Sequence, residues 1–301
     1  MKLKLILALA LSAGMVTFCT GDKSPAWEPA GNPLFTAWGE NIDPSAPWPE
    51  YPRPGLVRGD WMSLNGLWDY AICGKEEERP SPQGKILVPY PVESALSGVR
   101  IRMTDSLAIW YSREFTVPRS WEGKQLILNF EASDWETKVW IDDNFAISHQ
   151  GGYQDAVPVQ HNPLPLGKQK AHGGCKGHRS GGPGRKRQKG KQVTAPGSIW
   201  YTPSSGIWQS VWIEPVDNSW IDDLRIVPDI DNSTLTVTVM EERCHGPVGC
   251  PPLDMAPSLA EVTVRSDGAT IAVSSGMTGT PITMIIPDAI LWSPDDAGTL
   301  Y

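Results

Sequence analysis

A hairpin pattern in the first half of the chain constrains its fold more than any other sequence feature. Two short apolar segments, residues 138–141 and 145–149, flank Asp142-Asp143-Asn144. Because aspartate and asparagine tolerate positive φ and bond to their own backbone, these three residues predict a tight turn. Residues 125–130, rich in Leu, Ile and Phe, predict another strand just before the hairpin. The region is therefore expected to form an antiparallel sheet.

The composition extends this prediction to the whole chain. Its 301 residues are enough for two domains of ordinary size. The 14 tryptophans, 28 prolines and 29 glycines suit strands joined by tight turns better than long helices. No segment combines helical periodicity with caps at both ends. We therefore expect an all-β protein.

Spaced aromatic motifs indicate a family. They are found in order at residues 61–70 (WMSLNGLWDY), 110–115 (WYSREF), 130–135 (FEASDW), 151–153 (GGY) and 199–215 (IWYTPSSGIWQSVWIEP). Together they resemble the N-terminal sugar-binding domain of glycoside hydrolase family 2, the family of β-galactosidases, β-glucuronidases and β-mannosidases. The resemblance covers roughly residues 27–153 and 191–301.

The resemblance implies two domains. Residues 20–216 are expected to form a galactose-binding-like jelly-roll sandwich, with Asn65-Gly66 as a turn and residues 211–213 as a sheet edge. Residues 217–301 are expected to form a truncated immunoglobulin-like β-sandwich. Its strands are predicted at 221–227, 235–239, 261–265, 270–274 and 281–286. In the family, a motif like that at residues 291–301 precedes the last strands of this domain and the catalytic barrel.

The resemblance also implies where the chemistry takes place. Family 2 enzymes use two glutamic acids in a retaining mechanism, which needs carboxyl groups about 5–5.5 Å apart. Both stand on a (β/α)₈ barrel, and this sequence has no alternating strand–helix series to build one. We therefore assign no catalytic residue, cofactor or metal, and expect the chain alone to be inactive. A carbohydrate is the partner expected for the full-length enzyme.

Four residues are candidates for contact with a sugar. In the family, loops of the sugar-binding domain reach the mouth of the barrel, and the matching positions here are Glu93, Ser94, Trp200 and Tyr201. Aromatic faces pack on the apolar side of a sugar ring, and carboxylates accept hydrogen bonds from its hydroxyl groups. The alternative is that Trp200 and Tyr201 belong to the core. Other carboxylates in predicted strands, such as Glu131 and Glu136, are interpreted as structural.

Residues 154–190 break the pattern. From Gly167 to Gln192 there is no Val, Ile, Leu, Met, Phe, Tyr or Trp, so no strand of a buried sheet is expected there. Nine Lys and Arg residues lie between Lys168 and Lys191, in a chain whose formal net charge is −8. The segment is expected to be disordered or the product of a reading-frame slip.

This segment has two other interpretations. A basic patch could bind nucleic acid, but no aromatic residue is interleaved to stack on bases, so no nucleic-acid partner is expected. His172, Cys175 and His178 have metal-ligand spacing but lack a fourth ligand. The reading-frame slip is the favoured hypothesis.

The N-terminus predicts export from a bacterial cell. Residues 1–19 have two lysines followed by an apolar segment too short for a membrane span. Cys19 resembles a lipoprotein cleavage site, although Phe18 replaces the usual small residue. Lipidation of Cys19 and ordinary cleavage remain alternatives, giving a cell-surface lipoprotein or a secreted or periplasmic protein. Cys244 and Cys250 either close a small disulfide loop or are unpaired surface thiols.

Two function classes follow. The first is the N-terminal portion of a secreted family 2 glycoside hydrolase. The second is a stand-alone carbohydrate-binding or cell-surface adhesion module, which an unbroken strand pattern and a complete second sandwich would favour. The basic segment and the truncated second domain favour the first class.

Overall fold

The computed structural model describes residues 27–31, 33–152, 159–161, 167–176, 190–193, 195–244, 256–289 and 291. Their regular secondary structure consists almost entirely of β-strands, in agreement with the predicted class. The helical elements are the four-residue α1 (Ala37–Glu40) and two 3-10 helices (Ala95–Ser97 and Arg119–Trp121). Within the described ranges, no helix has the length and apolar character needed to cross a bilayer.

The first part of the chain forms two large antiparallel sheets and a short strand pair. One sheet has the order β1 (Met62–Ser63), β12 (Val211–Val216), β5 (Gln125–Phe130) and β9 (Val159–His161). The other has the order β3 (Gly84–Val88), β2 (Gly66–Gly74), β4 (Leu107–Val117), β10 (Gly167–Lys176), β7 (Glu136–Ile141) and β8 (Asn144–Gln150). The short pair is β11 (Gly206–Ile207) with β6 (Ser133–Asp134).

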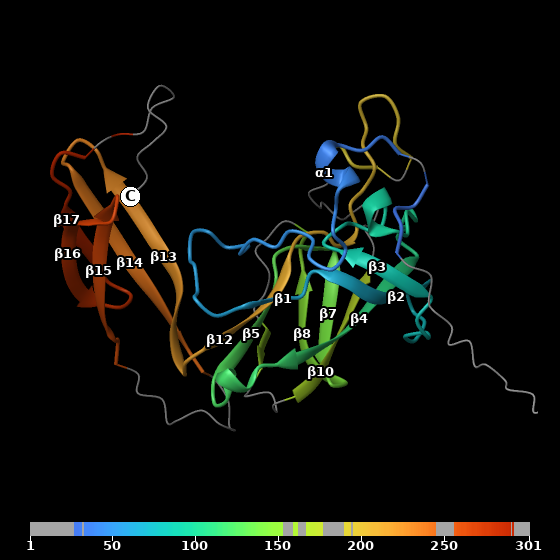
Figure 1. The fold of residues 1–301 in the computed structure, drawn as a ribbon, viewed down its shortest axis with the longest axis horizontal. Coiled ribbons are helices and arrows are strands. Elements are labelled where there is room, and N and C mark those ends of the chain that lie inside the picture. Colours follow the sequence, from blue (N-terminus) through green and yellow to red (C-terminus); the bar gives the residue numbers. More distant parts are fainter. Residues whose placement is uncertain are drawn as a thin grey trace, which may run out of the picture.

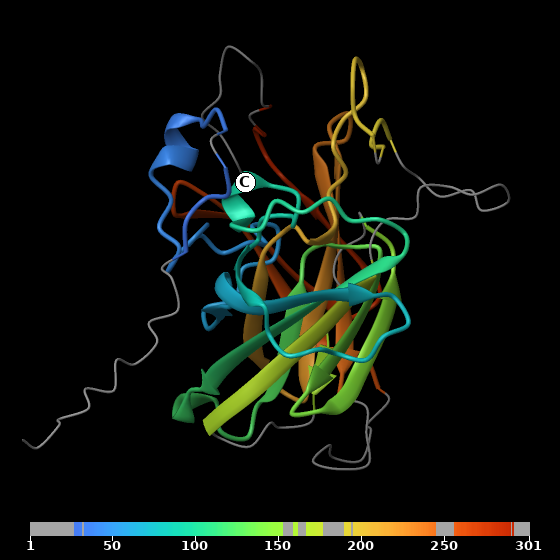
Figure 2. The same cartoon turned by 90° about the vertical axis from the view of Figure 1, so that its right-hand side faces the viewer.

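The two large sheets pack face to face around one core (Figures 1 and 2). Leu128 and Ile213 come from the four-stranded sheet, and Trp68, Ile109 and Ile141 come from the six-stranded one. All five side chains are almost completely buried. This shared core makes the first group of strands a β-sandwich, as predicted.

Residues 167–176 contradict the prediction that no strand lies in the basic segment. They form β10, which pairs with β4 along its whole length and with β7 over residues 171–176. Its buried residues alternate, and they are small or polar: Gln169, Ala171, Gly173 and Cys175. A strand needs alternation more than branched apolar residues when its neighbours supply the bulk. The premise behind the reading-frame slip is thus wrong for these ten residues.

The turn predictions had mixed outcomes. Asp142 and Asp143 have φ values of 47° and 62°, so the predicted hairpin between β7 and β8 is confirmed.

Asn65-Gly66 is not a hairpin turn, because it carries the chain from β1 in one sheet to β2 in the other. The buried Asn65 holds this crossing by accepting a hydrogen bond from Val211 N at 2.9 Å. Residues 211–213 are not a sheet edge either, because β12 lies between β1 and β5.

The second group of strands begins three residues after β12 ends, and Figure 1 shows it beside the first. One sheet has the order β13 (Ser219–Asp229), β14 (Thr234–Arg243) and β17 (Pro281–Ile285). The other consists of β15 (Leu259–Ser266) and β16 (Ala269–Met277). Their shared core includes Val237, Val264 and Ile282. All five strands predicted for this region are present.

Glu241 ties the end of this second sandwich together. Its carboxylate accepts hydrogen bonds from Ser219 on β13 and Arg243 on β14, and from Ser258 and Thr278, which adjoin the ends of β15 and β16. Burial alone would raise the pKa of Glu241, but these hydrogen bonds outweigh it and hold the pKa well below its usual range. The carboxylate therefore clamps the sandwich in its ionised form.

Candidate functional site

Glu93, the first candidate sugar contact, is turned inward. Its Oε2 accepts a hydrogen bond from Ser205 N at 2.9 Å, and its Oε1 accepts one from Met103 N at 3.4 Å. Burial raises the pKa of Glu93, and these hydrogen bonds offset part of that rise. Glu93 thus joins two loops at one end of the sandwich, and its carboxylate is committed to backbone groups.

Ser94 has a local role in the same loop. Its Oγ accepts a hydrogen bond from Leu96 N at 3.2 Å and caps the 3-10 helix Ala95–Ser97. The Ser94 backbone N–H donates to Pro91 O at 2.8 Å. Both contacts fix the shape of this loop beside Glu93.

Trp200 and Tyr201 lie on the surface, so the interpretation that they belong to the core is wrong. Their exposed fractions are 46% and 62%. The segment that carries them is held by backbone bonds, from Tyr201 N to Lys191 O and from Val193 N to Tyr201 O. Ser205, the partner of Glu93, follows four residues later. The structure therefore places the two aromatic residues on the segment that Glu93 anchors, with ring surface available to a ligand.

A buried carboxylate that was not among the predicted site residues is that of Glu214 on β12, whose side chain has no exposed surface. It accepts hydrogen bonds from Tyr51 Oη at 2.8 Å, from Trp212 Nε1 and from Arg58 Nε. Burial and the bond to Glu214 raise the pKa of Tyr51 to about 12. The sequence does contain one signal for it: Glu214 is a single acidic residue in an otherwise apolar strand. A carboxylate buried in such a strand requires hydrogen-bond or charged partners.

Other carboxylates in the first sandwich have structural contacts. Glu131 Oε2 accepts a bond from Ser210 N at 3.3 Å, and Glu136 pairs with Lys138 at 3.7 Å. This supports their interpretation as structural groups. No cluster of three or more His, Cys, Asp or Glu residues suited to a metal is found in the described part of the chain.

Cys175 does not suit the metal interpretation. It is fully buried on β10, and its Sγ lies 3.1 Å from Ser133 Oγ and 3.7 Å from Thr137 Oγ1. Burial raises the pKa of Cys175 to about 11, which keeps the thiol protonated, whereas zinc binds a thiolate. The His172 side chain and His178 lie outside what the structure describes.

Cys244 takes part in a disulfide and is buried, so the interpretation of it as an unpaired surface thiol is wrong. Cys250 lies outside the described residues, so the predicted Cys244–Cys250 pairing stays a prediction. Cys19, the signal segment at residues 1–19 and most of residues 154–190 also lie outside the described residues.

The similarity to known proteins extends over most of this chain. No protein-family model matches the sequence. The β-glucuronidase of Paenibacillus borealis is 23% identical over 269 residues, which cover 81% of this chain and 42% of that protein. The solved β-glucuronidase of Faecalibacterium prausnitzii superposes with a TM-score of 0.58 at 20% identity, over 79% of this chain and 43% of its own.

A β-glucuronidase from Ruminococcus gnavus, solved in complex with D-glucuronic acid, has a TM-score of 0.56 at 17% identity and covers 84% of this chain. These likenesses confirm the all-β fold. They also confirm the resemblance to glycoside hydrolase family 2, specifically to the N-terminal portion of its β-glucuronidases. The chain spans about two-fifths of the length of the proteins that it matches.

Proposed function

From this homology to the N-terminal portion of family 2 enzymes, we propose that the chain forms the non-catalytic first part of a glycoside hydrolase. The complete enzyme acts on β-linked glycosides, and β-glucuronides are the first substrate class to test because the relatives are named β-glucuronidases. The observation that carries this proposal is that the likeness extends over four-fifths of this chain.

In this proposal the Glu93 end of the sandwich borders the substrate. Trp200 and Tyr201 offer exposed aromatic surface to a sugar ring. Glu93 and Ser94 act as positioning residues, because their oxygens already hold the neighbouring backbone. Of the four residues predicted from the sequence, Trp200 and Tyr201 are therefore proposed to contact the sugar, and Glu93 and Ser94 to position the loops around it.

The first test is a hydrolysis assay of the purified chain with nitrophenyl β-glucuronide, β-galactoside and β-mannoside. We expect no release of nitrophenol above the blank, whereas an active β-glucuronidase included as a control hydrolyses its substrate. Release above the blank by the chain itself would contradict the proposal.

The second test is the DNA sequence. Resequencing codons 154–192 and the region beyond codon 301 should reveal a barrel with two glutamates downstream. A verified stop immediately after Tyr301 would instead favour a stand-alone carbohydrate-binding or surface adhesion module. The exposed Trp200 and Tyr201 suit that alternative as well, since binding modules also use aromatic surface.

Export from a bacterial cell is part of the proposal. The disulfide at Cys244 supports it, because disulfides persist in oxidising compartments. Mass spectrometry of the mature N-terminus in the native host separates the two forms: acylated Cys19 indicates a lipoprotein, and an unmodified start near residue 20 indicates ordinary cleavage. An uncleaved cytoplasmic protein would contradict export.

A further inference from the structure

Two stretches of chain connect the second sandwich to the first. Residues 217–218 link β12 to β13 directly, and residues 51–58, here called the strap, reach from the first sandwich to the start of β13 (Figure 1). In the described part of the chain, the buried apolar cluster at this joint consists of Ile127, Val216 and Trp220. Domains within one chain move relative to each other unless their interface is large and hydrophobic. The polar contacts across this joint therefore determine whether it bends.

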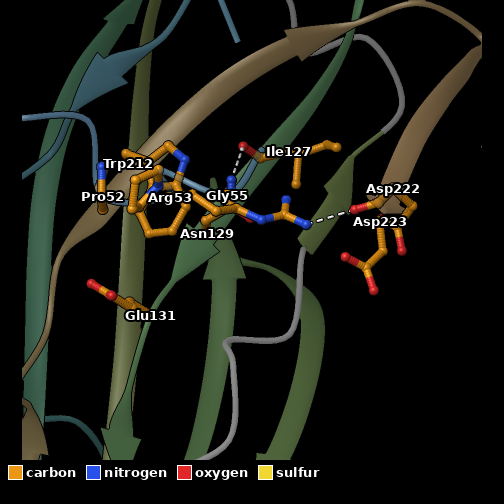
Figure 3. Close-up of a pocket in the computed structure, with 10 residues that line it drawn as sticks. Pro52, Arg53, Gly55, Ile127, Asn129, Glu131, Trp212, Asp222 and Asp223 are labelled. Atoms are coloured by element: carbon orange, nitrogen blue, oxygen red, sulfur yellow. Dashed lines mark hydrogen bonds between the residues drawn. The ribbon is translucent and has the colours of Figure 1, made fainter. Parts of the chain in front are cut away.

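The strap is bonded to the second sandwich at a bulge in β13. Arg53 Nη2 donates to Asp222 O at 2.6 Å, and Figure 3 shows this side chain extending across to β13. Arg58 Nη2 donates to Ile221 O at 2.7 Å. The register with β14 shifts between Ile221 and Asp223, so Asp222 stands opposite no residue of that strand. A bulge residue is left out of the strand ladder, and here its carbonyl group is bonded by the strap instead.

The strap is held to the first sandwich by the buried Glu214 on β12. The Glu214 carboxylate accepts hydrogen bonds from Tyr51 Oη at 2.8 Å and from Arg58 Nε. The Arg58 guanidinium thus contacts both sandwiches, which is possible because it presents several N–H donors in a planar fork. The Arg58 side chain is 16% exposed, so this ion pair is largely shielded from water. Breaking such a pair leaves a buried charge uncompensated, and the strap is therefore firmly attached at this end.

The direct link between the sandwiches has weaker contacts. Lys124 Nζ lies 2.5 Å from Asp217 Oδ1, but the two side chains are 42% and 74% exposed. An exposed ion pair of this kind contributes little to stability. Gln125 Nε2 also donates to Asn218 Oδ1 at 3.0 Å. The strap, with its buried ion pair, is therefore the stronger polar attachment.

We propose that the strap locks the two sandwiches into one rigid body, and that Arg53 and Arg58 are the residues that close it. While both arginines are bonded to β13, the second sandwich keeps one orientation on the first. When both are released, residues 217–218 act as a hinge. This inference does not rest on the proposed function. Within the proposed function, the same strap sets where a catalytic domain that follows the second sandwich lies relative to Trp200 and Tyr201.

The test is backbone amide NMR relaxation of the intact, deuterated chain, which gives a rotational correlation time for each sandwich. We expect one correlation time to describe both sandwiches of the wild type. In Arg53→Met/Arg58→Lys, the contacts with β13 are lost, while a cation remains beside Glu214 to keep its charge paired. The two correlation times should then become shorter and unequal, with the larger decrease in the smaller second sandwich.

The matched control is Arg119→Met/Arg225→Lys, which makes the same two changes at exposed arginines outside the strap, one in each sandwich. It should keep the correlation time of the wild type. Amide chemical-shift dispersion shows whether both sandwiches are folded. If the strap double variant does not fold, Arg53→Met alone leaves the Arg58–Glu214 pair intact and should give a smaller change of the same kind. Unequal correlation times in the wild type, or wild-type values in the folded strap variant, would overturn the proposal.

Discussion

Strands β5 and β10 occupy equivalent interior positions in the two sheets of the first sandwich, yet their residues are very different. All six residues of β5, QLILNF, are buried, and three of them, two leucines and a phenylalanine, lie in the main core. β10 reads GKQKAHGGCK and contributes only Ala171 and Cys175 to that core. One strand brings volume to the core, and the other brings very little.

The neighbours of β10 account for the difference. Gly173 stands opposite Tyr111 on β4 and Val139 on β7, and Ala171 stands opposite Ile141. Each of these partners is buried in the same core. Small residues in a central strand are therefore compatible with dense packing when large side chains flank them on both sides. An interior strand depends on its alternation and its neighbours, and its own hydrophobicity can be low.

The largest effect is expected in β5. Leu128→Ala removes most of a side chain that is 3% exposed, and should lower the free energy of unfolding by about 3 kcal/mol through lost burial and the cavity left behind. Urea denaturation should show a lower midpoint with an unchanged slope. A loss below about 1 kcal/mol would mean that β5 does not carry the core as described.

A smaller loss of stability, caused by overpacking instead of a cavity, is expected in β10. Ala171→Leu inserts three carbons where Ile141 already fills the space, and should cost about 2 kcal/mol by overpacking. Lys170→Leu, one residue earlier on the exposed face, is the matched control and should change stability far less. If Ala171→Leu were neutral or stabilising, β10 would not pack in this register.

The same contrast explains how much of the fold could be predicted. The β7–β8 hairpin and the five strands of the second sandwich follow local patterns of apolar residues and turns, and these were found from the sequence. β10 was missed because the large residues that complete its packing lie on β4 and β7. The sheet crossing at Asn65 was also missed, since its partner Val211 is 146 residues away.

The candidate site was predictable only in part. The position of Trp200 and Tyr201 in the chain identified them as candidates, but their exposure depends on how the 190–205 segment is held. The inward orientation of Glu93 depends on Ser205, 112 residues later. The Glu214 cluster joins Tyr51 to β12 across 163 residues, and no local pattern signals such a contact.

Cys175 provides a smaller and pH-dependent test of β10. Cys175→Ala should cost about 1 kcal/mol at pH 7 through lost packing. Burial raises the pKa of this thiol to about 11, above its value in the unfolded chain. The folded state therefore holds the proton more tightly, so the thiol's stabilising contribution is complete below about pH 8.5 and is lost as the pH rises towards 11.

Denaturation of the wild type and Cys175→Ala at about pH 7.5 and pH 10 measures this loss, because other titrating groups are common to both proteins. The advantage of the wild type should shrink at the higher pH. Cys73→Ala serves as a second free-thiol control. An advantage that stays constant, or rapid labelling of Cys175 in the folded chain, would show that its thiol is not buried.

The smallest effect is expected on the outer face of β10. Lys170→Gln changes an exposed side chain, while its backbone N–H keeps the 2.9 Å bond to Asp142 Oδ1. The change in the free energy of unfolding should therefore stay within about 0.5 kcal/mol, as for most surface substitutions. Lys191→Gln, on an exposed loop outside the sheets, is the matched control. A loss of more than about 1 kcal/mol at Lys170, with none at Lys191, would mean that the basic residues of β10 stabilise the sheet through specific contacts. The contrast between β5 and β10 would then rest on charge rather than on the size of their inward residues.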